Sequence, residues 1–464
     1  MVFSSMTFLL FFLPLTLALY FCRKSISWRN GVLLVASLVF YSWDRPVWIF
    51  AMLASTAVNY VAAIKLAAVK RRRQKKRMWM LVGVGFSLGM LFVFKYSAFF
   101  LNGLLSLFGA RISGIEMPIG ISFYTFQIIT YTVDVYRGTT PVQKRFSRLL
   151  LYVCCFPQLI AGPIVRYDDV AKQLQSREST MDDFSGGMSR FVVGLSKKVL
   201  LANICGAALE KTALATGGAA LSFIGAWYSA LLYTLQIYFD FSAYSDMAIG
   251  LGRVFGFRYR ENFNYPYISK GISEFWRRWH ISLGTFFREY VYIPLGGNRG
   301  GALLTARNLM IVWELTGLWH GASANFVLWG LYYGALQLLE RFILGKVWKK
   351  LPSIFTWFVT LVLVMIGWML FYYTDVSCAF RHIGAMLGMG SGGLLDATTR
   401  AVMRRYSLFP LIACICALPV APMLRRLFAR RADMVRIVCA TLLFVISVMA
   451  LVGQSYNPFI YFRF

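Results

Sequence analysis

The chain has 464 residues, of which 58% are hydrophobic and 17% aromatic but only 14% charged. A soluble globular domain carries about 25% charged residues, so this composition excludes an ordinary soluble fold and indicates bilayer hydrocarbon as the main solvent. The net charge is +29, but Lys and Arg gather in short segments between apolar runs, which argues against nucleic acid as a partner.

Apolar runs close to the length of a membrane span recur from the N-terminus onward. A span needs about 20 apolar residues, and runs near that length occur at residues 2–20, 78–94, 221–239, 355–370 and 437–452. The first run lacks a basic leading segment and a small-residue cleavage site, so we expect a permanent span there. The pattern predicts an all-α, polytopic helical bundle of about ten to twelve spans, with residues 1–464 as a single integral-membrane domain.

A basic segment, KRRRQKKR, follows at residues 70–77. Short basic loops stay in the cytoplasm, where anionic lipid headgroups also attract them. We interpret this segment as a topology signal and expect it to lie against membrane lipid. A binding site for a specific partner is the alternative.

The middle of the chain, residues 116–333, carries Gly, Pro, polar and charged residues between its apolar stretches. Polar groups are costly in hydrocarbon, so this region is expected to face an internal cavity or a funnel open to water and to contain the functional site. Three stretches within it are amphipathic and too polar to span: 182–200, 268–290 and the loop 294–308. The second stretch has the pattern of a helix lying at the interface. Its apolar face is formed at three- and four-residue spacing by Phe275, Trp279, Ser282 and Phe286.

Histidine is scarce, and only His280, His320 and His382 occur. A neutral imidazole suits proton transfer near neutral pH, and two of the three, His280 and His320, lie in the polar middle region, so these two are the candidates. Around His320, the small residues at 317 and 321–323 leave room for a backbone or a thin substrate arm. From the residues alone, a core histidine bonded to a backbone carbonyl is an equal alternative.

His280 is flanked by Trp276, Arg277, Arg278 and Trp279. An arginine pair with tryptophans can bind phosphate groups and stack on adenine, which would suit coenzyme A. Anchoring at the membrane interface, where Trp and Arg are enriched, is the simpler alternative.

Three carboxylates in this region are expected to be structural. Asp240 and Asp246 are six residues apart and so lie on different helix faces, where each needs a polar partner or water. Glu314 is expected to orient its helix or to pair with an arginine. The eight cysteines form no CxxC pair or Cys/His spacing, so we expect neither a metal site nor a bound cofactor.

Taken together, six motifs of the chain resemble the membrane-bound O-acyltransferase family, in its alginate and peptidoglycan O-acetyltransferase branch. They occur in the order of the family over more than half of the chain. These motifs are PIGISFYTFQIITYTVDVYRG (118–138), FPQLIAGPIVRY (156–167), QIYFDFSAYSDMAIGLG (236–252), ENFNYPYIS (261–269), FWRRWHISLGTFFREYVYIPLGGNRGG (275–301) and GLWHGASANFVLWG (317–330).

The resemblance implies a ring of helices around a central tunnel in the bacterial cytoplasmic (inner) membrane. It makes His320 the catalytic histidine and His280 a second catalytic residue, at the second motif position of the family near the cytoplasmic entrance of the tunnel. The donor would be acetyl-CoA or an acyl carrier protein, and Asn325 is a candidate for stabilising the oxyanion. Tyr461, in the aromatic tail 454–464, would relay the acyl group to an extracytoplasmic SGNH-type acyltransferase acting on a cell-envelope polysaccharide.

Other functions stay open at this point. D-alanyl transfer to teichoic acid from a carrier protein uses the same family chemistry. A transporter or flippase would also place charges within the membrane, but would show inverted repeats, which we do not find. A scaffold for envelope enzymes would not depend on His320.

Overall fold

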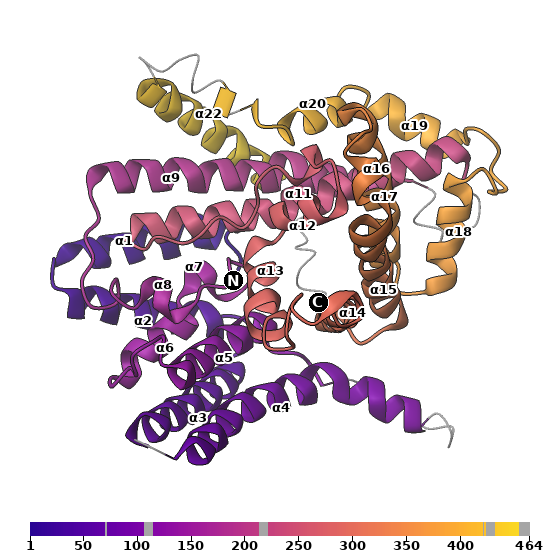
Figure 1. Cartoon of the computed structure of the whole chain (residues 1–464). Coiled ribbons are helices and arrows are strands. Elements are labelled where there is room, and N and C mark those ends of the chain that lie inside the picture. Colours follow the sequence, from indigo (N-terminus) through magenta and orange to yellow (C-terminus); the bar gives the residue numbers. More distant parts are fainter. Residues whose placement is uncertain (70–71, 106–114, 213–220, 421, 424–431, 454–464) are drawn as a thin grey trace. The chain divides into compact units, whose positions relative to one another are not determined.

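The computed structural model describes residues 1–69, 72–105, 115–212, 221–420, 422–423 and 432–453. These residues are helical apart from turns and short connections, with no β-strand among them (Figure 1). The helices, in chain order, are η1(Phe8–Phe12), α1(Leu13–Cys22), α2(Ile26–Ser42), α3(Trp48–Ala68), α4(Arg73–Leu105), α5(Ile121–Arg137), α6(Phe146–Cys154), α7(Phe156–Leu159), α8(Tyr167–Val170), α9(Met181–Ser196), η3(Lys197–Ala202), α10(Asn203–Leu209), α11(Phe223–Val254), η5(Pro266–Ile268), α12(Ile272–Arg278), α13(Ile281–Phe287), η6(Arg288–Tyr292), α14(Gly301–His320), α15(Ala324–Leu339), η7(Glu340–Leu344), α16(Gly345–Trp348), α17(Ser353–Tyr372), α18(Val376–Met386), α19(Ala397–Arg405), α20(Phe409–Cys416) and α22(Ala432–Gly453).

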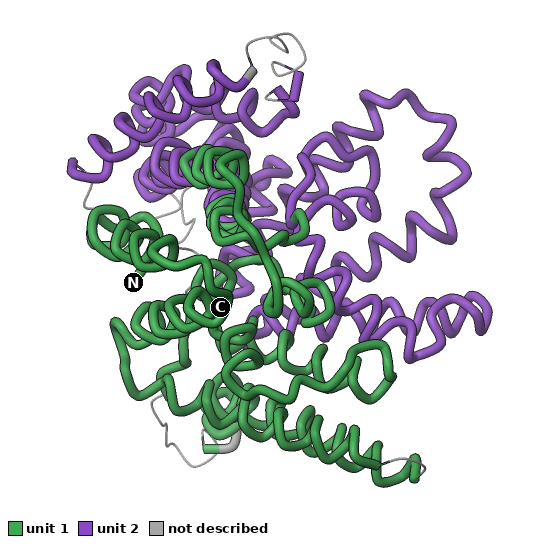
Figure 2. Tube along the Cα trace, turned by 90° about the vertical axis from the view of Figure 1, so that its left-hand side faces the viewer, with its two compact units in different colours: residues 1–192, 244–261 green, residues 193–243, 262–464 purple. Residues whose placement is uncertain are grey.

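The chain divides into two compact units (Figure 2). Unit 1 comprises Met1–Val192 and Tyr244–Glu261, and unit 2 comprises Val193–Ala243 and Asn262–Phe464. His280, His320 and His382 all belong to unit 2. A single domain over the whole chain stays a prediction.

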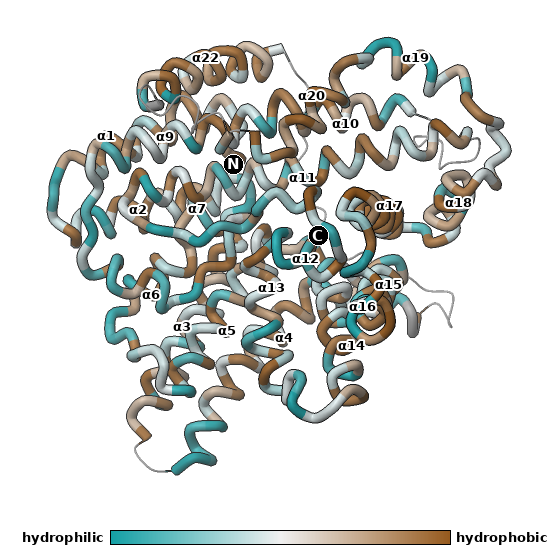
Figure 3. The backbone as a smooth tube through the Cα atoms, turned by 45° about the horizontal axis from the view of Figure 1, so that its top comes forward, coloured by the Kyte–Doolittle hydropathy of each residue, from teal (hydrophilic) through white to brown (hydrophobic). Residues whose placement is uncertain are grey.

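Within the described ranges, five helices are long and apolar enough to cross a membrane: Trp48–Ala68, Arg73–Asn102, Met181–Leu209, Ser353–Tyr372 and Asp433–Gly453. In the last of these, only 11% of the most apolar window is buried inside the protein. Helices α17 and α22 are accordingly drawn mostly in brown (Figure 3). Exposed apolar surface of this extent needs lipid around it, so the chain is an integral membrane protein. The number of ten to twelve spans, the ring and the tunnel stay predictions.

The expectation that residues 182–200 are too polar to span is wrong. Helices α9, η3 and α10 follow one another without a break, and together they make the candidate span Met181–Leu209. Two of its charges, Asp182 and Asp183, stand in the first turn. A third, Lys198, is paired, since its Nζ lies 2.6 Å from Asp240 Oδ1. Pairing removes the charge from contact with hydrocarbon, which composition alone could not show.

The expectation of one interfacial helix over residues 268–290 is also wrong. The stretch is interrupted at Trp279 and His280, which separate the short helix α12 from α13 and the η6 turn that follows it. The side chains of Phe275, Trp279 and Phe286 are buried in protein, so this aromatic face is not available to a membrane surface. The expected loop 294–308 ends early, because α14 begins at Gly301.

Helices α14 and α15 pack closely against each other in unit 2 (Figure 1). Glycines on both helices allow this approach. A Cβ atom at Gly330 would lie 2.6 Å from the carbonyl oxygen of Trp313, and one at Gly317 would collide with the carbonyl of Phe326. The position of the α14 C-terminus, where His320 stands, therefore depends on these glycines.

We expect Gly330→Ala to destabilise the protein by about 1–3 kcal/mol, because the added methyl group has no space between the two backbones. The midpoint of thermal unfolding in detergent measures the effect. Gly85→Ala in α4 is the matched control, since nothing lies within 4 Å of a Cβ there, and alanine in a helix is about 0.5–1 kcal/mol more stable than glycine. Equal midpoints for the two variants would contradict the close packing.

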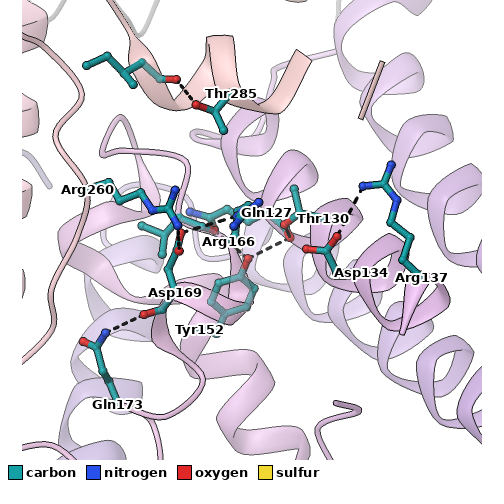
Figure 4. A network of polar contacts seen from close by, with 12 residues as sticks. Gln127, Thr130, Asp134, Arg137, Tyr152, Arg166, Asp169, Gln173, Arg260 and Thr285 are labelled. Atoms are coloured by element: carbon teal, nitrogen blue, oxygen red, sulfur yellow. Dashed lines mark hydrogen bonds and ion pairs between the residues drawn. The ribbon is translucent and has the colours of Figure 1, made fainter. Parts of the chain in front are cut away.

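The interior of unit 1 contains a polar network (Figure 4). The Tyr152 hydroxyl lies 3.0 Å from the carbonyl oxygen of Gln127 and 2.8 Å from that of Val165. At the surface of the same unit, Arg260 donates to Asp169 over 2.5 Å. The two Tyr152 contacts join the motifs at 118–138 and 156–167, which therefore contribute to the internal framework of unit 1.

Candidate active site

His320 is the last residue of α14 and is 4% exposed. Aromatic rings from α14, α15 and α17 surround it. The ring centroids of Trp319, Phe371 and Trp329 lie 4.8, 5.0 and 5.3 Å from that of the imidazole. Such an apolar surrounding excludes bulk water and strengthens any electrostatic interaction with a substrate.

The small residues beside His320 make room for protein. A Cβ at Gly321 would collide with the ring of Phe326, and the space at Gly317 is taken by the carbonyl of the same residue. The expected close approach of a backbone is thus confirmed at Gly317. The approaching backbone is that of α15. A substrate arm would therefore have to reach the imidazole from another side.

His280 stands in the break between α12 and α13 with a left-handed backbone, φ 43° and ψ 54°. This conformation costs an ordinary residue about 1–2 kcal/mol, although Asn, Asp and His adopt it more readily than most. Two backbone hydrogen bonds hold the break: Ile281 N–H donates to the carbonyl of Asn262, and Asn264 N–H donates to that of Arg278, both over 2.9 Å. The imidazole is 2% exposed.

Trp319 connects the two histidines. Its ring centroid lies 6.1 Å from that of His280 and 4.8 Å from that of His320. Phe241 from α11 packs perpendicular to the His280 ring, with the centroids 4.7 Å apart. Unit 2 therefore brings the two sequence-predicted histidines, 40 residues apart in the chain, into one aromatic cluster.

The tryptophans beside His280 already pack against other rings. Trp276 lies 4.8 Å from Tyr333 and 4.9 Å from Trp313 between ring centroids, and Trp279 lies 4.8 Å from Trp368. Because Trp279 is only 3% exposed, it offers no free face for an adenine ring. The suggested stacking of adenine therefore does not fit Trp279, and for Trp276 it stays a prediction.

The two arginines differ from each other. Arg278 forms an ion pair with Glu274 at 2.9 Å and donates to the carbonyl of Asn264 over 3.1 Å. Its guanidinium thus holds α12 in place. Arg277 is exposed. Of the two arginines, it is therefore the one that is accessible from outside the protein.

The model of the membrane-bound O-acyltransferase (MBOAT) family matches residues 145–380, and this range contains both His280 and His320. The chain is also 40% identical to the probable alginate O-acetylase of Pseudomonas putida over 499 aligned residues, which cover all of both chains. The chain belongs to the membrane-bound O-acyltransferase family. It is accordingly an O-acyltransferase.

Other members of the family are similar to this acyltransferase over different shares of its length. The peptidoglycan O-acetyltransferase of Helicobacter pylori is 30% identical over 100% of this chain and 98% of its own. The teichoic acid D-alanyltransferase of Bacillus subtilis is 28% identical over 51% of this chain and 62% of its own.

Asn325 stands at the start of α15 in this acyltransferase and is 1% exposed. Its Nδ2 lies 3.4 Å from the carbonyl oxygen of Leu370, and its Oδ1 accepts from the hydroxyl of Ser323. The amide therefore connects the start of α15 to α17, close in sequence to His320. Its role at an oxyanion stays a prediction.

His382 is a core histidine that is bonded to a backbone carbonyl. It is fully buried, with Nε2 3.0 Å from the carbonyl oxygen of Ala226 and Nδ1 3.0 Å from the hydroxyl of Tyr373. Both ring nitrogens are thus used in packing α18 within unit 2.

The two carboxylates of α11 have the polar partners that were expected. Asp240 pairs with Lys198, and Asp246 lies 2.9 Å from Arg190. Tyr461 and the tail 454–464 lie outside the described residues. Among the residues that the structure describes, no three His, Cys, Asp or Glu side chains are grouped so that they could hold a metal ion.

The sequence reasoning missed Asn262, Trp319 and Phe371. All three touch a clustered histidine: Asn262 by a hydrogen bond, the other two by ring contacts. Asn262 stands inside the motif ENFNYPYIS. A polar residue at the start of this aromatic segment was the one sign in the sequence that it has a function.

Proposed function

We propose that this acyltransferase moves an acetyl group from a cytoplasmic thioester donor towards an extracytoplasmic cell-envelope polysaccharide such as alginate or peptidoglycan. The observation that carries the proposal is the buried cluster in which Trp319 contacts both His280 and His320. The names of the relatives that share the full length of the chain support acetyl as the group. We place the protein in the bacterial cytoplasmic (inner) membrane.

In the proposed reaction, His320 acts as the general base. It takes the proton of the accepting hydroxyl while the oxygen attacks the thioester carbonyl. The new C–O bond forms, the C–S bond breaks, and the departing thiolate takes the proton back from the imidazolium. General-base assistance is worth about 10²–10⁴ in rate, and the positioning of both reactants supplies a further part. Asn325 is our candidate for stabilising the oxyanion.

For the donor, we propose acetyl-CoA, with the exposed Arg277 as the group that meets its phosphates. Arg278, Trp276 and Trp279 then act indirectly, because they hold the break that presents His280. An acyl carrier protein offers the same thioester with a phosphate on its arm, so Arg277 would serve both donors.

We further propose that Tyr461 receives the acetyl group as a phenolic ester and passes it to an extracytoplasmic SGNH-type acyltransferase. A covalent relay divides one difficult transfer into two easier steps. It also lets the acyl group reach the outer side of the membrane while the donor stays in the cytoplasm.

A second candidate is D-alanyl transfer from a carrier protein towards teichoic acid. The similarity to the teichoic acid D-alanyltransferase over half of the chain favours it. The longer and closer similarity to O-acetyltransferases favours acetyl. A transporter, a flippase or a scaffold would not need the histidine cluster.

The test is label transfer from radiolabelled acetyl-CoA to the purified protein in nanodiscs. We expect wild type and His382→Gln to become labelled, and His320→Ala and Tyr461→Phe to stay unlabelled. Labelling only from a D-alanyl carrier protein would overturn acetyl in favour of D-alanyl transfer. Labelling of Tyr461→Phe at the wild-type rate would overturn the relay, and no label from either donor would overturn acyl transfer from these thioesters.

A further inference from the structure

Asn262 is completely buried beside His280, and the proposed reaction does not use it. Its side-chain oxygen lies 3.1 Å from Nδ1 of His280, 3.2 Å from the backbone nitrogen of Ser282 and 2.9 Å from the Ser282 hydroxyl. The backbone of Asn262 is fixed as well, since its carbonyl accepts from Ile281 N–H over 2.9 Å. The amide is therefore held in one place relative to the imidazole.

The backbone N–H of Ser282 determines which end of the amide faces the histidine. An amide oxygen only accepts hydrogen bonds and an amide NH₂ only donates, so the atom that faces a backbone N–H must be the oxygen. The same atom faces Nδ1 of His280. Nδ1 must then carry a proton, since two acceptors at 3.1 Å would repel each other.

The Ser282 hydroxyl does not change this conclusion. It lies 2.9 Å from Asn262 Oδ1 and 3.4 Å from His280 Nδ1. If the hydroxyl proton pointed to Nδ1, the amide would have to turn its NH₂ group to the ring. Two donors, that NH₂ and the Ser282 backbone N–H, would then face each other.

We propose that Asn262 is a positioning residue that holds His280 as the neutral imidazole with its proton on Nδ1 and its lone pair on Nε2. The proton on one ring nitrogen is set by the hydrogen bond that this nitrogen makes. In this state, Nε2 of His280 accepts a hydrogen bond from a hydroxyl or thiol, and it cannot donate one. The tautomer of His280 is independent of the proposed function. Only the effect of this tautomer on acyl transfer rests on the proposed function.

His382 provides an internal comparison in the same unit. Its Nε2 faces the carbonyl oxygen of Ala226 at 3.0 Å, and a carbonyl oxygen only accepts. The proton of His382 therefore stands on Nε2, and Nδ1 accepts from the Tyr373 hydroxyl at 3.0 Å. The structure thus assigns opposite tautomers to two buried histidines of one protein.

The test is solid-state NMR of the full chain in lipid, with only histidine labelled by ¹⁵N and ¹³C. Three histidines give a spectrum that can be assigned with His280→Asn, His320→Gln and His382→Gln. Asparagine at 280 keeps the tolerance for the left-handed backbone. We expect His280 protonated on Nδ1 and His382 on Nε2. A His280 ring protonated on Nε2 would overturn the proposal, because the amide would then be turned the other way.

Two variants with a control separate positioning from structural support. Asn262→Asp keeps an oxygen acceptor for Nδ1 and should keep the Nδ1 proton, whereas Asn262→Leu removes the acceptor and should shift the proton to Nε2. Ser282→Ala is the control, since it leaves the bond between Asn262 and His280 in place and should leave the tautomer unchanged. Thermal unfolding shows whether Asn262→Leu is folded; if it is not, the tautomers of wild type, Asn262→Asp and Ser282→Ala still decide the question.

The kinetic readout distinguishes this proposal from the proposed function. We expect Asn262→Leu to lower kcat for label transfer by about tenfold or more, which is part of the factor of about 10²–10⁴ that proton transfer supplies. Asn262→Asp should recover part of the rate, with KM for acetyl-CoA little changed in both variants. If the tautomers are as assigned but neither His280→Asn nor Asn262→Leu affects the rate, the role of His280 in the transfer fails while the assignment stands. A tautomer of His280 that does not respond to Asn262→Leu would contradict the positioning role itself.

Discussion

His320→Gln is expected to lower the rate of acyl transfer by about 10²–10⁴, while the protein stays folded. Glutamine fills a similar space in the aromatic cluster of Trp319, Trp329 and Phe371 and keeps a polar group, but it cannot take up the hydroxyl proton. The measurement is the initial rate of label transfer from radiolabelled acetyl-CoA, with thermal unfolding as the test of folding.

The control for this variant is His382→Gln, the same replacement at another buried histidine of unit 2. A glutamine amide can donate to the carbonyl of Ala226 and accept from the Tyr373 hydroxyl, as the histidine does. We expect a rate close to that of wild type. If His320→Gln kept a rate comparable to His382→Gln, His320 would not be the general base.

Lys198→Met is expected to destabilise the protein by about 3–5 kcal/mol, because it leaves the carboxylate of Asp240 buried without its ion-pair partner. The pair is 2.6 Å long, and its side chains are 4% and 2% exposed. Since Asp240 precedes Phe241, which packs on the His280 ring, we also expect a lower rate of acyl transfer. Thermal unfolding in detergent and the label-transfer rate measure the two effects.

The double variant Lys198→Met with Asp240→Leu should recover most of the lost stability. Replacing both members of a buried ion pair by apolar residues is often neutral, whereas removing one member is costly. Equal stability of the single and double variants would show that the pair is not coupled. Recovery of stability without recovery of rate would indicate that the pair also orients Phe241.

The long apolar helices could be predicted from the sequence. The run at 355–370 lies within α17, and the run at 437–452 lies within α22. Their apolar length depends only on neighbouring residues, so a local pattern is enough to find them. The span Met181–Leu209 was missed because Lys198 finds its partner 42 residues away, beyond the reach of any local window.

The site was only partly predictable. The family motifs identified His280 and His320, but not their common contact with Trp319. The break after Trp279 has no signal in the sequence, since neither Gly nor Pro marks it and helical spacing continues on both sides. The structure shows instead that pairing with the segment at Asn262 and Asn264 holds it. Asn262 was overlooked for the same reason, because its partner lies 18 residues further on.

Unit 1 is built from two segments that are not consecutive in the chain, and this affects the order in which the units can be completed during synthesis. Its closing segment, Tyr244–Glu261, leaves the ribosome only after residues 193–243 of unit 2. That segment supplies Arg253, 3.1 Å from Asp183, and Asp246, 2.9 Å from Arg190. Until it arrives, the nascent chain must keep these charges in contact with water or with the insertion machinery, since lipid would not accept them. The first unit therefore completes its insertion out of chain order, after part of the second unit has already been synthesised.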